Sequence, residues 1–137
     1  TKNRIPLSGV IFRWDIEGYE YNIVKANQSF FKKLKHSSII MEFHPFYLGP
    51  DKTIEFLQIL KKCGFLLDQV VACEPLYFIK TPPMIRKLLN SLFLMEYGGN
   101  NLGLLDDYKS LDDLSREYKN HKSGLYHYPN LHLYLSK

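Results

Sequence analysis

The sequence has little of what marks several specialised protein classes. Its two cysteines are too few for a disulfide scaffold, and no CxxC spacing suggests a metal finger. The longest apolar stretch, 88–95, is interrupted by Asn90 and Ser91 and is too short to cross a bilayer. The first residues lack the apolar core of a secretory leader. We therefore expect a cytoplasmic protein with no membrane partner.

The charged residues also lack any long run of one sign. Eighteen Lys and Arg against fourteen acidic residues give a net charge of +4, but pairs such as Lys32–Lys33 and Lys61–Lys62 never extend to five. Such spacing is typical of solvated helix faces, so we expect no nucleic-acid partner. What the chain does have is a 45% hydrophobic share and a 15% aromatic share. These values suit one globular domain with one core.

Apolar segments of two different periods alternate along the first half of the chain. The expected elements are a strand at 9–15, a helix at 19–34, a strand at 37–44, a helix opened by residues 49–51 and closed by Cys63-Gly64, and a strand at about 69–74. Asp51 is the expected N-cap of the second helix. This order predicts an α/β domain with mostly parallel strands and helices on both faces of the sheet.

The second half of the chain has a weaker pattern. Pro82-Pro83 can start a helix with an apolar face at 85–93, and Ser110 with Asp113 is typical of a helix N-terminus. Residues 131–135 alternate Leu with polar side chains and predict a terminal strand, which we expect to be antiparallel. No linker divides residues 1–137, so we expect a single domain.

Polar residues gather where the first two expected strands end. Ligands of open α/β sheets bind at the carboxyl ends of the strands. Asp15 ends the first strand, while Glu42 and His44 end the second. Glu17-Gly18 forms the turn into the helix, and a glycine there allows a positive φ or a close approach to a ligand. We therefore expect Asp15, Glu17, Glu42 and His44 to face one cleft.

Three segments carry a resemblance to a known family. They are Trp14-Asp15-Ile16-Glu17-Gly18-Tyr19-Glu20 with the following Ile23-Val24-Lys25-Ala26, then Met41-Glu42-Phe43-His44-Pro45, and finally Cys63-Gly64-Phe65. Their order resembles the FkbM family of S-adenosylmethionine-dependent methyltransferases, in which a strand ends in Asp-x-Glu-Gly-x-Glu. The resemblance covers roughly residues 10–71. It implies a partial Rossmann-like sheet, equivalent to strands four to seven of a seven-stranded methyltransferase domain, with a C-terminal antiparallel strand.

The resemblance also implies a chemistry and a set of residues. The implied reaction is methyl transfer from S-adenosylmethionine to the oxygen of a sugar or small-molecule hydroxyl, with that small molecule as partner. Asp15, Glu17 and Gly18 would then contact the cofactor, and Asp15, Glu42 and His44 would be catalytic. Residues 75–129 would form an acceptor-side insertion. Its expected pocket walls are Tyr77, Phe78, Tyr97 and Tyr108.

The sequence departs from the family in one respect. Fourteen residues precede Asp15, and they contain no glycine-rich cofactor loop. An active enzyme would therefore need an N-terminal cofactor-binding half.

Other interpretations of the same residues stay open. One is a non-catalytic binding or assembly module that forms a homodimer through the exposed edge of the first strand. Glu20 suits the first turn of a helix better than it suits chemistry. Asp15, Glu42 and His44 could also ligate Mg, Mn or Zn, but spacing across strands cannot be verified from sequence, so we assign no metal site from it.

Overall fold

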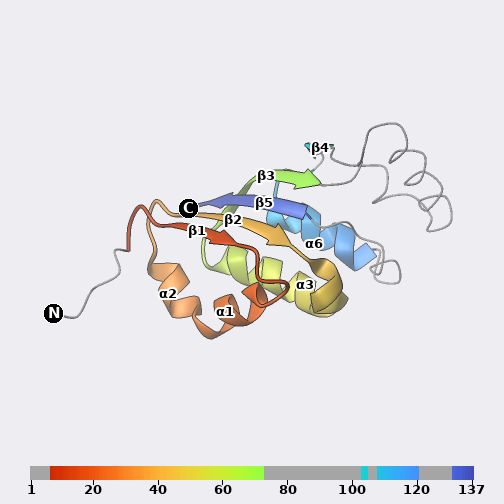
Figure 1. The fold of residues 1–137 in the computed structure, drawn as a ribbon, viewed down its shortest axis with the longest axis horizontal. Coiled ribbons are helices and arrows are strands. Elements are labelled where there is room, and N and C mark those ends of the chain that lie inside the picture. The colour runs from red at the N-terminus through yellow and green to blue at the C-terminus, as the bar shows by residue number, and fades with distance from the viewer. Residues whose placement is uncertain (1–6, 73–102, 105–107, 121–130) are drawn as a thin grey trace.

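The computed structural model describes residues 7–72, 103–104, 108–120 and 131–137 (Figure 1). Their elements, in chain order, are β1 Ile11–Trp14, α1 Glu20–Ala26, α2 Gln28–Lys33, β2 Ser38–Phe43, α3 Pro45–Lys62, β3 Leu66–Ala72, β4 Gly103–Leu104, α6 Leu111–Asn120 and β5 Leu131–Ser136. These residues form an α/β structure, as the sequence predicts. The helix expected at 82–93 lies outside the described residues.

The strands form one mixed sheet in the order β1-β2-β5-β3-β4. β1 and β2 are parallel, whereas β5 is antiparallel to both of its neighbours, β2 and β3. β1, β2 and β3 therefore run in one direction, and the expected antiparallel C-terminal strand is confirmed. The common direction of β1, β2 and β3 is also as expected. Because β5 lies between β2 and β3, β1 and β2 form the one parallel pair among the described strands.

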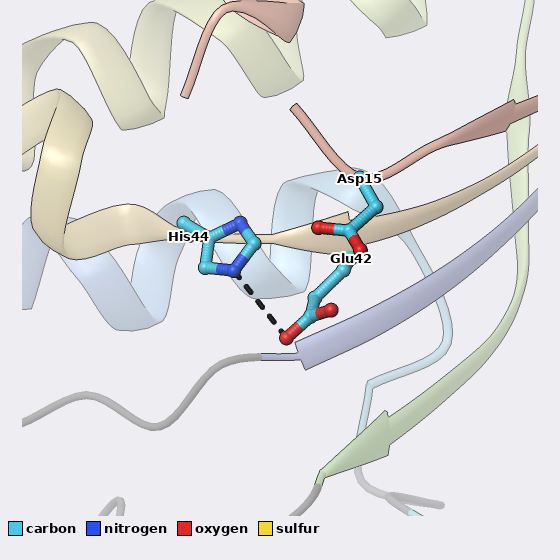
Figure 2. Close-up of side chains that lie close together, drawn as sticks. All are labelled: Asp15, Glu42 and His44. Carbon is cyan, nitrogen blue, oxygen red and sulfur yellow. Dashed lines mark ion pairs between the residues drawn. The ribbon is translucent and has the colours of Figure 1, made fainter. Parts of the chain in front are cut away.

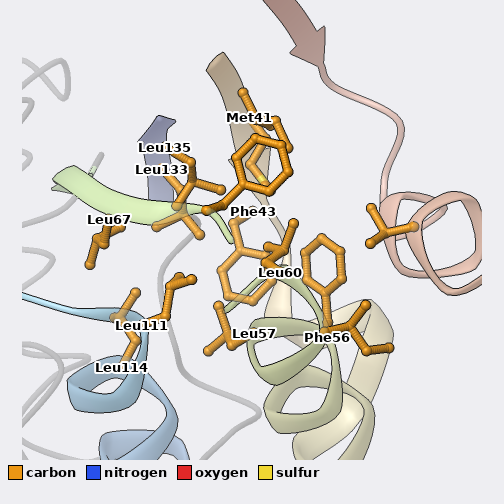
Figure 3. Packing of buried hydrophobic residues seen from close by; sticks show 14 of the residues in the cluster. Met41, Phe43, Phe56, Leu57, Leu60, Leu67, Leu111, Leu114, Leu133 and Leu135 are labelled. Atoms are coloured by element: carbon orange, nitrogen blue, oxygen red, sulfur yellow. The ribbon is translucent and has the colours of Figure 1, made fainter. Parts of the chain in front are cut away.

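The composition of β5 explains its central place. Leu131, Leu133 and Leu135 alternate with less buried residues, and all three are at most 1% exposed. Between β2 and β3 this leucine row meets apolar rows on both sides, whereas at an edge it would meet one. Figure 3 shows Leu133 and Leu135 beside Met41, above the side chains that rise from the helices.

The described helices all pack on the same face of the sheet. In Figure 1, α1, α2 and α3 lie below the strands, and α6 lies beside α3 in the same layer. The core between the layers includes Phe43 from the sheet, Phe56 and Leu60 from α3, and Leu114 from α6 (Figure 3). The opposite face of the described strands carries more polar and less buried side chains. Coverage of that second face stays a prediction.

Two helices differ from their expected bounds. The helix expected at 19–34 is split at Asn27, whose backbone leaves the helical region with φ −120° and ψ 29°. α3 starts earlier than expected, at Pro45, and is broken at Gly49, where φ is 72° and ψ is 170°. Asp51 is therefore not an N-cap. Pro50 restarts the helix after the break, because proline suits a first helical position.

The C-terminal ends of α2 and α3 share one cation. The Lys137 ammonium donates to the carbonyl oxygens of Phe31 at 3.1 Å and Lys32 at 2.9 Å, and also to that of Cys63. A positive charge is favourable here because the last carbonyls of a helix have no partner within it. Cys63 is a buried free thiol, as expected. Cys73 lies outside the described residues.

Candidate functional site

The segment between β1 and α1 is a tight turn with unusual backbone angles. The N–H of Tyr19 donates to the carbonyl of Ile16 at 3.1 Å, and both central residues have positive φ, 51° at Glu17 and 93° at Gly18. Positive φ at both central positions is the pattern of a type I′ turn. Glycine adopts it freely, but for Glu17 the left-handed region costs roughly 1–2 kcal/mol.

Gly18 is also a point of close approach between this turn and α3. A Cβ added at Gly18 would lie 2.9 Å from the Cβ of Tyr47, in the first turn of α3. The glycine therefore lets the turn between β1 and α1 pack against the first turn of α3. A contact with cofactor at Gly18, which the resemblance implies, stays a prediction.

The buried side chain of Glu20 stabilises the turn between β1 and α1. Its side chain is buried, with 1% of the residue exposed, and Oε1 accepts the backbone N–H of Ile16 at 3.1 Å. This carboxylate connects the first turn of α1 to the residue that follows the end of β1 by two positions. No side chain caps α1 at Tyr19. Its observed contact is structural, which agrees with its expected place in the first turn.

The parallel register brings the two strand ends side by side. The last register pair joins Trp14 of β1 to Met41 of β2, so Asp15 and Glu42 follow it at neighbouring positions. His44, two residues after Glu42, is buried and occupies the N-cap position of α3. Its Nε2 lies 3.3 Å from Oε1 of Glu42.

Asp15, Glu42 and His44 form a compact cluster, which we call the strand-end cluster. One ligand atom from each residue lies within 4.8 Å of the other two. Figure 2 shows the carboxylate of Asp15 extending toward the imidazole, with the carboxylate of Glu42 on the same side of the strand. Exposure falls across the cluster, since Asp15 is exposed, Glu42 half-buried and His44 buried. Glu17 is exposed and lies outside it.

Exposed aromatic side chains stand next to the cluster. Tyr47 is 59% exposed, and its ring centroid lies 5.7 Å from that of His44. Phe46 is 56% exposed and contacts Tyr47 edge-on, also at 5.7 Å. Sequence reasoning missed this pair, although both residues directly follow His44-Pro45. Their exposure on a helix could not be read while the helix was expected to start at residue 51.

The pocket walls expected from the sequence have a different outcome. Tyr108 is partly buried and packs against the hydrophobic core. Tyr77, Phe78 and Tyr97 lie outside the described residues.

An apolar pocket of about 350 Å³ lies between β1 and the helices α1 and α2. Its lining comes from β1, α1 and α2, namely Phe12, Trp14, Ile23, Asn27, Phe30 and Phe31. β1 is an edge strand of the sheet among the described residues. Ile11 on this strand is 70% exposed. The edge strand and the aromatic pocket together form a surface suited to a further α/β element or a second protein.

Comparison with protein-family models, with curated proteins and with solved structures finds no match to this chain. The family assignment therefore remains an expectation based on the residues quoted above. None of the described helices is long and apolar enough to span a membrane.

Proposed function

We propose that these residues form the C-terminal half of an S-adenosylmethionine-dependent methyltransferase of FkbM-like type, acting on a sugar or small-molecule hydroxyl. One observation carries the proposal. The segment with the family-like motif and the Glu42–His44 segment meet at one edge of the sheet, where Asp15, Glu42 and His44 lie within 4.8 Å of one another. This edge is where ligands bind in open α/β sheets.

The strand arrangement also supports the proposal. β1, β2 and β3 run in one direction, and the C-terminal strand β5 is antiparallel. That is the mixture expected for strands four to seven of a methyltransferase sheet. The open edge of β1 is where the strands of an N-terminal half would continue the sheet, and the aromatic pocket beside it would receive their helix.

The side chains at the turn between β1 and α1 suit only the methionine portion of S-adenosylmethionine. Bound S-adenosylmethionine would supply the methyl group. Asp15 and Glu17 offer exposed carboxylates to the amino group of its methionine portion. The residues before Asp15 hold no glycine-rich loop for the remainder. The proposed enzyme therefore takes its adenosine site from sequence outside these residues.

The acceptor would meet the strand-end cluster. His44 is the candidate general base for the hydroxyl proton, because an imidazole nitrogen can accept a proton from a hydroxyl within hydrogen-bond reach. Glu42 orients that imidazole across 3.3 Å. The exposed rings of Phe46 and Tyr47 offer an apolar surface for the body of a sugar or ring substrate. Positioning and proton removal are the contributions that methyl transfer to oxygen needs.

The test is calorimetric titration of S-adenosylmethionine into the longest chain that contains these residues. We expect saturable binding, and a loss of roughly tenfold in affinity in Asp15→Asn, which corresponds to one charge-assisted hydrogen bond. Asp68→Asn is the matched control, since Asp68 is exposed on β3 and its oxygen can still accept from Ser136. A long chain that carries a glycine-rich loop and shows neither heat nor a thermal shift would contradict the proposal.

The open β1 edge favours a second candidate, an assembly module that dimerises by strand pairing. Unpaired edge strands invite pairing with another chain. Sedimentation at increasing concentration would then show a dimer, and Ile11→Lys would shift it to monomer, because a lysine on the exposed edge opposes pairing. A monodisperse monomer of the native chain would exclude this candidate.

A further inference from the structure

We propose that the strand-end cluster of Asp15, Glu42 and His44 binds a divalent transition-metal ion such as Mn²⁺. The proposal rests on the geometry of these side chains and does not depend on methyl transfer. With the ion bound, His44 and Asp15 are its ligands, in place of the roles proposed for them above. Two carboxylates and an imidazole, from the ends of two parallel strands, present ligand atoms within 4.8 Å of one another. Carboxylate oxygens and imidazole nitrogens are both ordinary ligands for such ions.

The spacing is close to that of a metal site. Ligands at about 2.0–2.2 Å from one ion lie about 3.0–3.5 Å apart when they occupy adjacent positions. The Nε2 of His44 and Oε1 of Glu42 are already 3.3 Å apart. The three ligand atoms lie within 4.8 Å of one another, and the side chain of Asp15 is exposed, so it has room to move toward an ion.

His44 provides a second, independent observation. Its side chain is 8% exposed, and its Nδ1 is buried with no hydrogen-bond partner. With the proton on Nε2, that N–H lies beside the Glu42 carboxylate, and the electron pair of the buried Nδ1 is left unused. With the proton on Nδ1, the Nε2 electron pair faces the Glu42 oxygen instead. Each neutral tautomer therefore leaves a ring nitrogen with an electron pair that a cation can accept.

The charge and the solvent access of the strand-end cluster suit a bound cation. The cluster holds two acidic groups and one imidazole, so a divalent ion reduces the repulsion between the carboxylates. Asp15 lies at the solvent side, which gives an ion an entry path. The single nitrogen ligand favours Mn²⁺, Fe²⁺ or Zn²⁺ over Ca²⁺. Three protein ligands leave positions open for water or for a hydroxyl of a small molecule.

The test is titration of the native chain with MnCl₂, with free ion measured by electron paramagnetic resonance. We expect one bound Mn²⁺ per chain. Asp15→Asn and Glu42→Gln should each weaken its binding by at least about tenfold, because even the loss of a residue that only hydrogen-bonds to a metal ligand costs 10- to 100-fold. Asp15 is exposed, so its variant leaves the core intact. Asp68→Asn, an exposed aspartate on β3, is the control and should bind as the native chain does.

A second readout locates the ion. Bound Mn²⁺ should broaden the NMR signals of Gly18 and Tyr47, which lie beside the cluster, more strongly than those of Asp68, which is two strands away and nearer the opposite end of the sheet. Native binding weaker than about 1 mM, or equal binding by native chain, Asp15→Asn and Glu42→Gln, would overturn the proposal, since scattered surface carboxylates would explain it. The titration contains no S-adenosylmethionine, so its outcome is separate from the test of the proposed function.

Discussion

The turn before α1 and the turn before α6 both place an acid near a helix N-terminus, yet they are built differently. At α6, Ser110 Oγ accepts the N–H of Asp113 at 3.2 Å and donates to its carboxylate at 2.8 Å. Lys109 N–H also donates to that carboxylate, at 3.2 Å. This is a capping arrangement in which every local preference agrees.

The turn before α1 instead holds a non-glycine residue at positive φ and has no side-chain cap at Tyr19. A buried carboxylate, Glu20, holds it from inside. Backbone strain that the surroundings maintain is concentrated at functional sites. The α6 turn therefore agrees with every local preference, whereas the α1 turn holds a strained residue two positions after Asp15, which fits the proposed site there.

The largest expected effect is that of Gly18→Ala. Positive φ and the collision with Tyr47 together should lower the free energy of unfolding by roughly 2–4 kcal/mol, measured by urea denaturation. Gly9→Ala is the control, because Gly9 has a positive φ of 70° with no atom within 4 Å of the added Cβ. Equal losses in the two variants would show that the contact with α3 contributes nothing.

Glu20→Ala should follow, with a loss of about 1–3 kcal/mol in the free energy of unfolding. The variant leaves the N–H of Ile16 without its acceptor in a buried setting. Glu20→Gln keeps an acceptor oxygen and should lose less. Should the glutamine variant be as unstable as the alanine variant, the carboxylate acts through its charge and not through this hydrogen bond.

Ser110→Ala should cost about 1 kcal/mol, the usual value for loss of an N-cap side chain. Thermal denaturation can measure it. Ser29→Ala on the exposed side of α2 is the comparison and should change stability little. A loss at Ser110 as large as that of Gly18→Ala would remove the distinction between the two turns.

Glu17→Gly should raise the free energy of unfolding by up to about 1 kcal/mol, because glycine adopts a φ of 51° without the steric cost that glutamate has. The same variant should bind S-adenosylmethionine more weakly if the turn contacts cofactor as proposed. Denaturation and calorimetry on one preparation give both values. A destabilised variant would mean that the glutamate side chain itself supports the fold.

The smallest expected effect is on stability at low pH. The hydrogen bond from Ser110 holds the pKa of Asp113 below its ordinary value of 3.8. Its contribution to stability is therefore complete above that value and is lost as pH falls through the lowered folded pKa. Between about pH 5 and about pH 2, the urea midpoint of Asp113→Asn should fall less than that of the native chain. Parallel curves for the two chains would contradict this assignment.

Local signals predicted much of this fold. Neighbouring residues predicted the helix end at Cys63-Gly64, the capping residues at Ser110 and the leucine row of β5. They also predicted the ends of the first two strands to within one residue, at Asp15 and His44, where the structure has Trp14 and Phe43. The central place of β5 did not follow, because strand order depends on pairing between segments far apart in sequence. The early start of α3 was missed since Gly49-Pro50 is a strong start signal that here restarts a helix already begun.

The candidate site was likewise predicted from the sequence only in part. That Asp15, Glu42 and His44 lie at strand ends could be read from sequence, and the structure brings these three together. The burial of His44 and its contact with Tyr47 depend on how α3 packs against the turn at Gly18, which no local pattern contains. Exposed aromatic residues at a helix start were missed for the same reason.

The parallel register of β1 and β2 has a consequence for how this region can evolve. Side chains alternate between the two faces of a sheet, so a one-residue slip moves each of them to the opposite face. Insertion or deletion of a single residue within β1 would turn Asp15 away from Glu42 and place Arg13 or Trp14 on the wrong side. A change in register that keeps Asp15 and Glu42 on the same face can thus occur only by whole pairs of residues. Lineages that keep the site should show substitutions in this strand but no single-residue gaps.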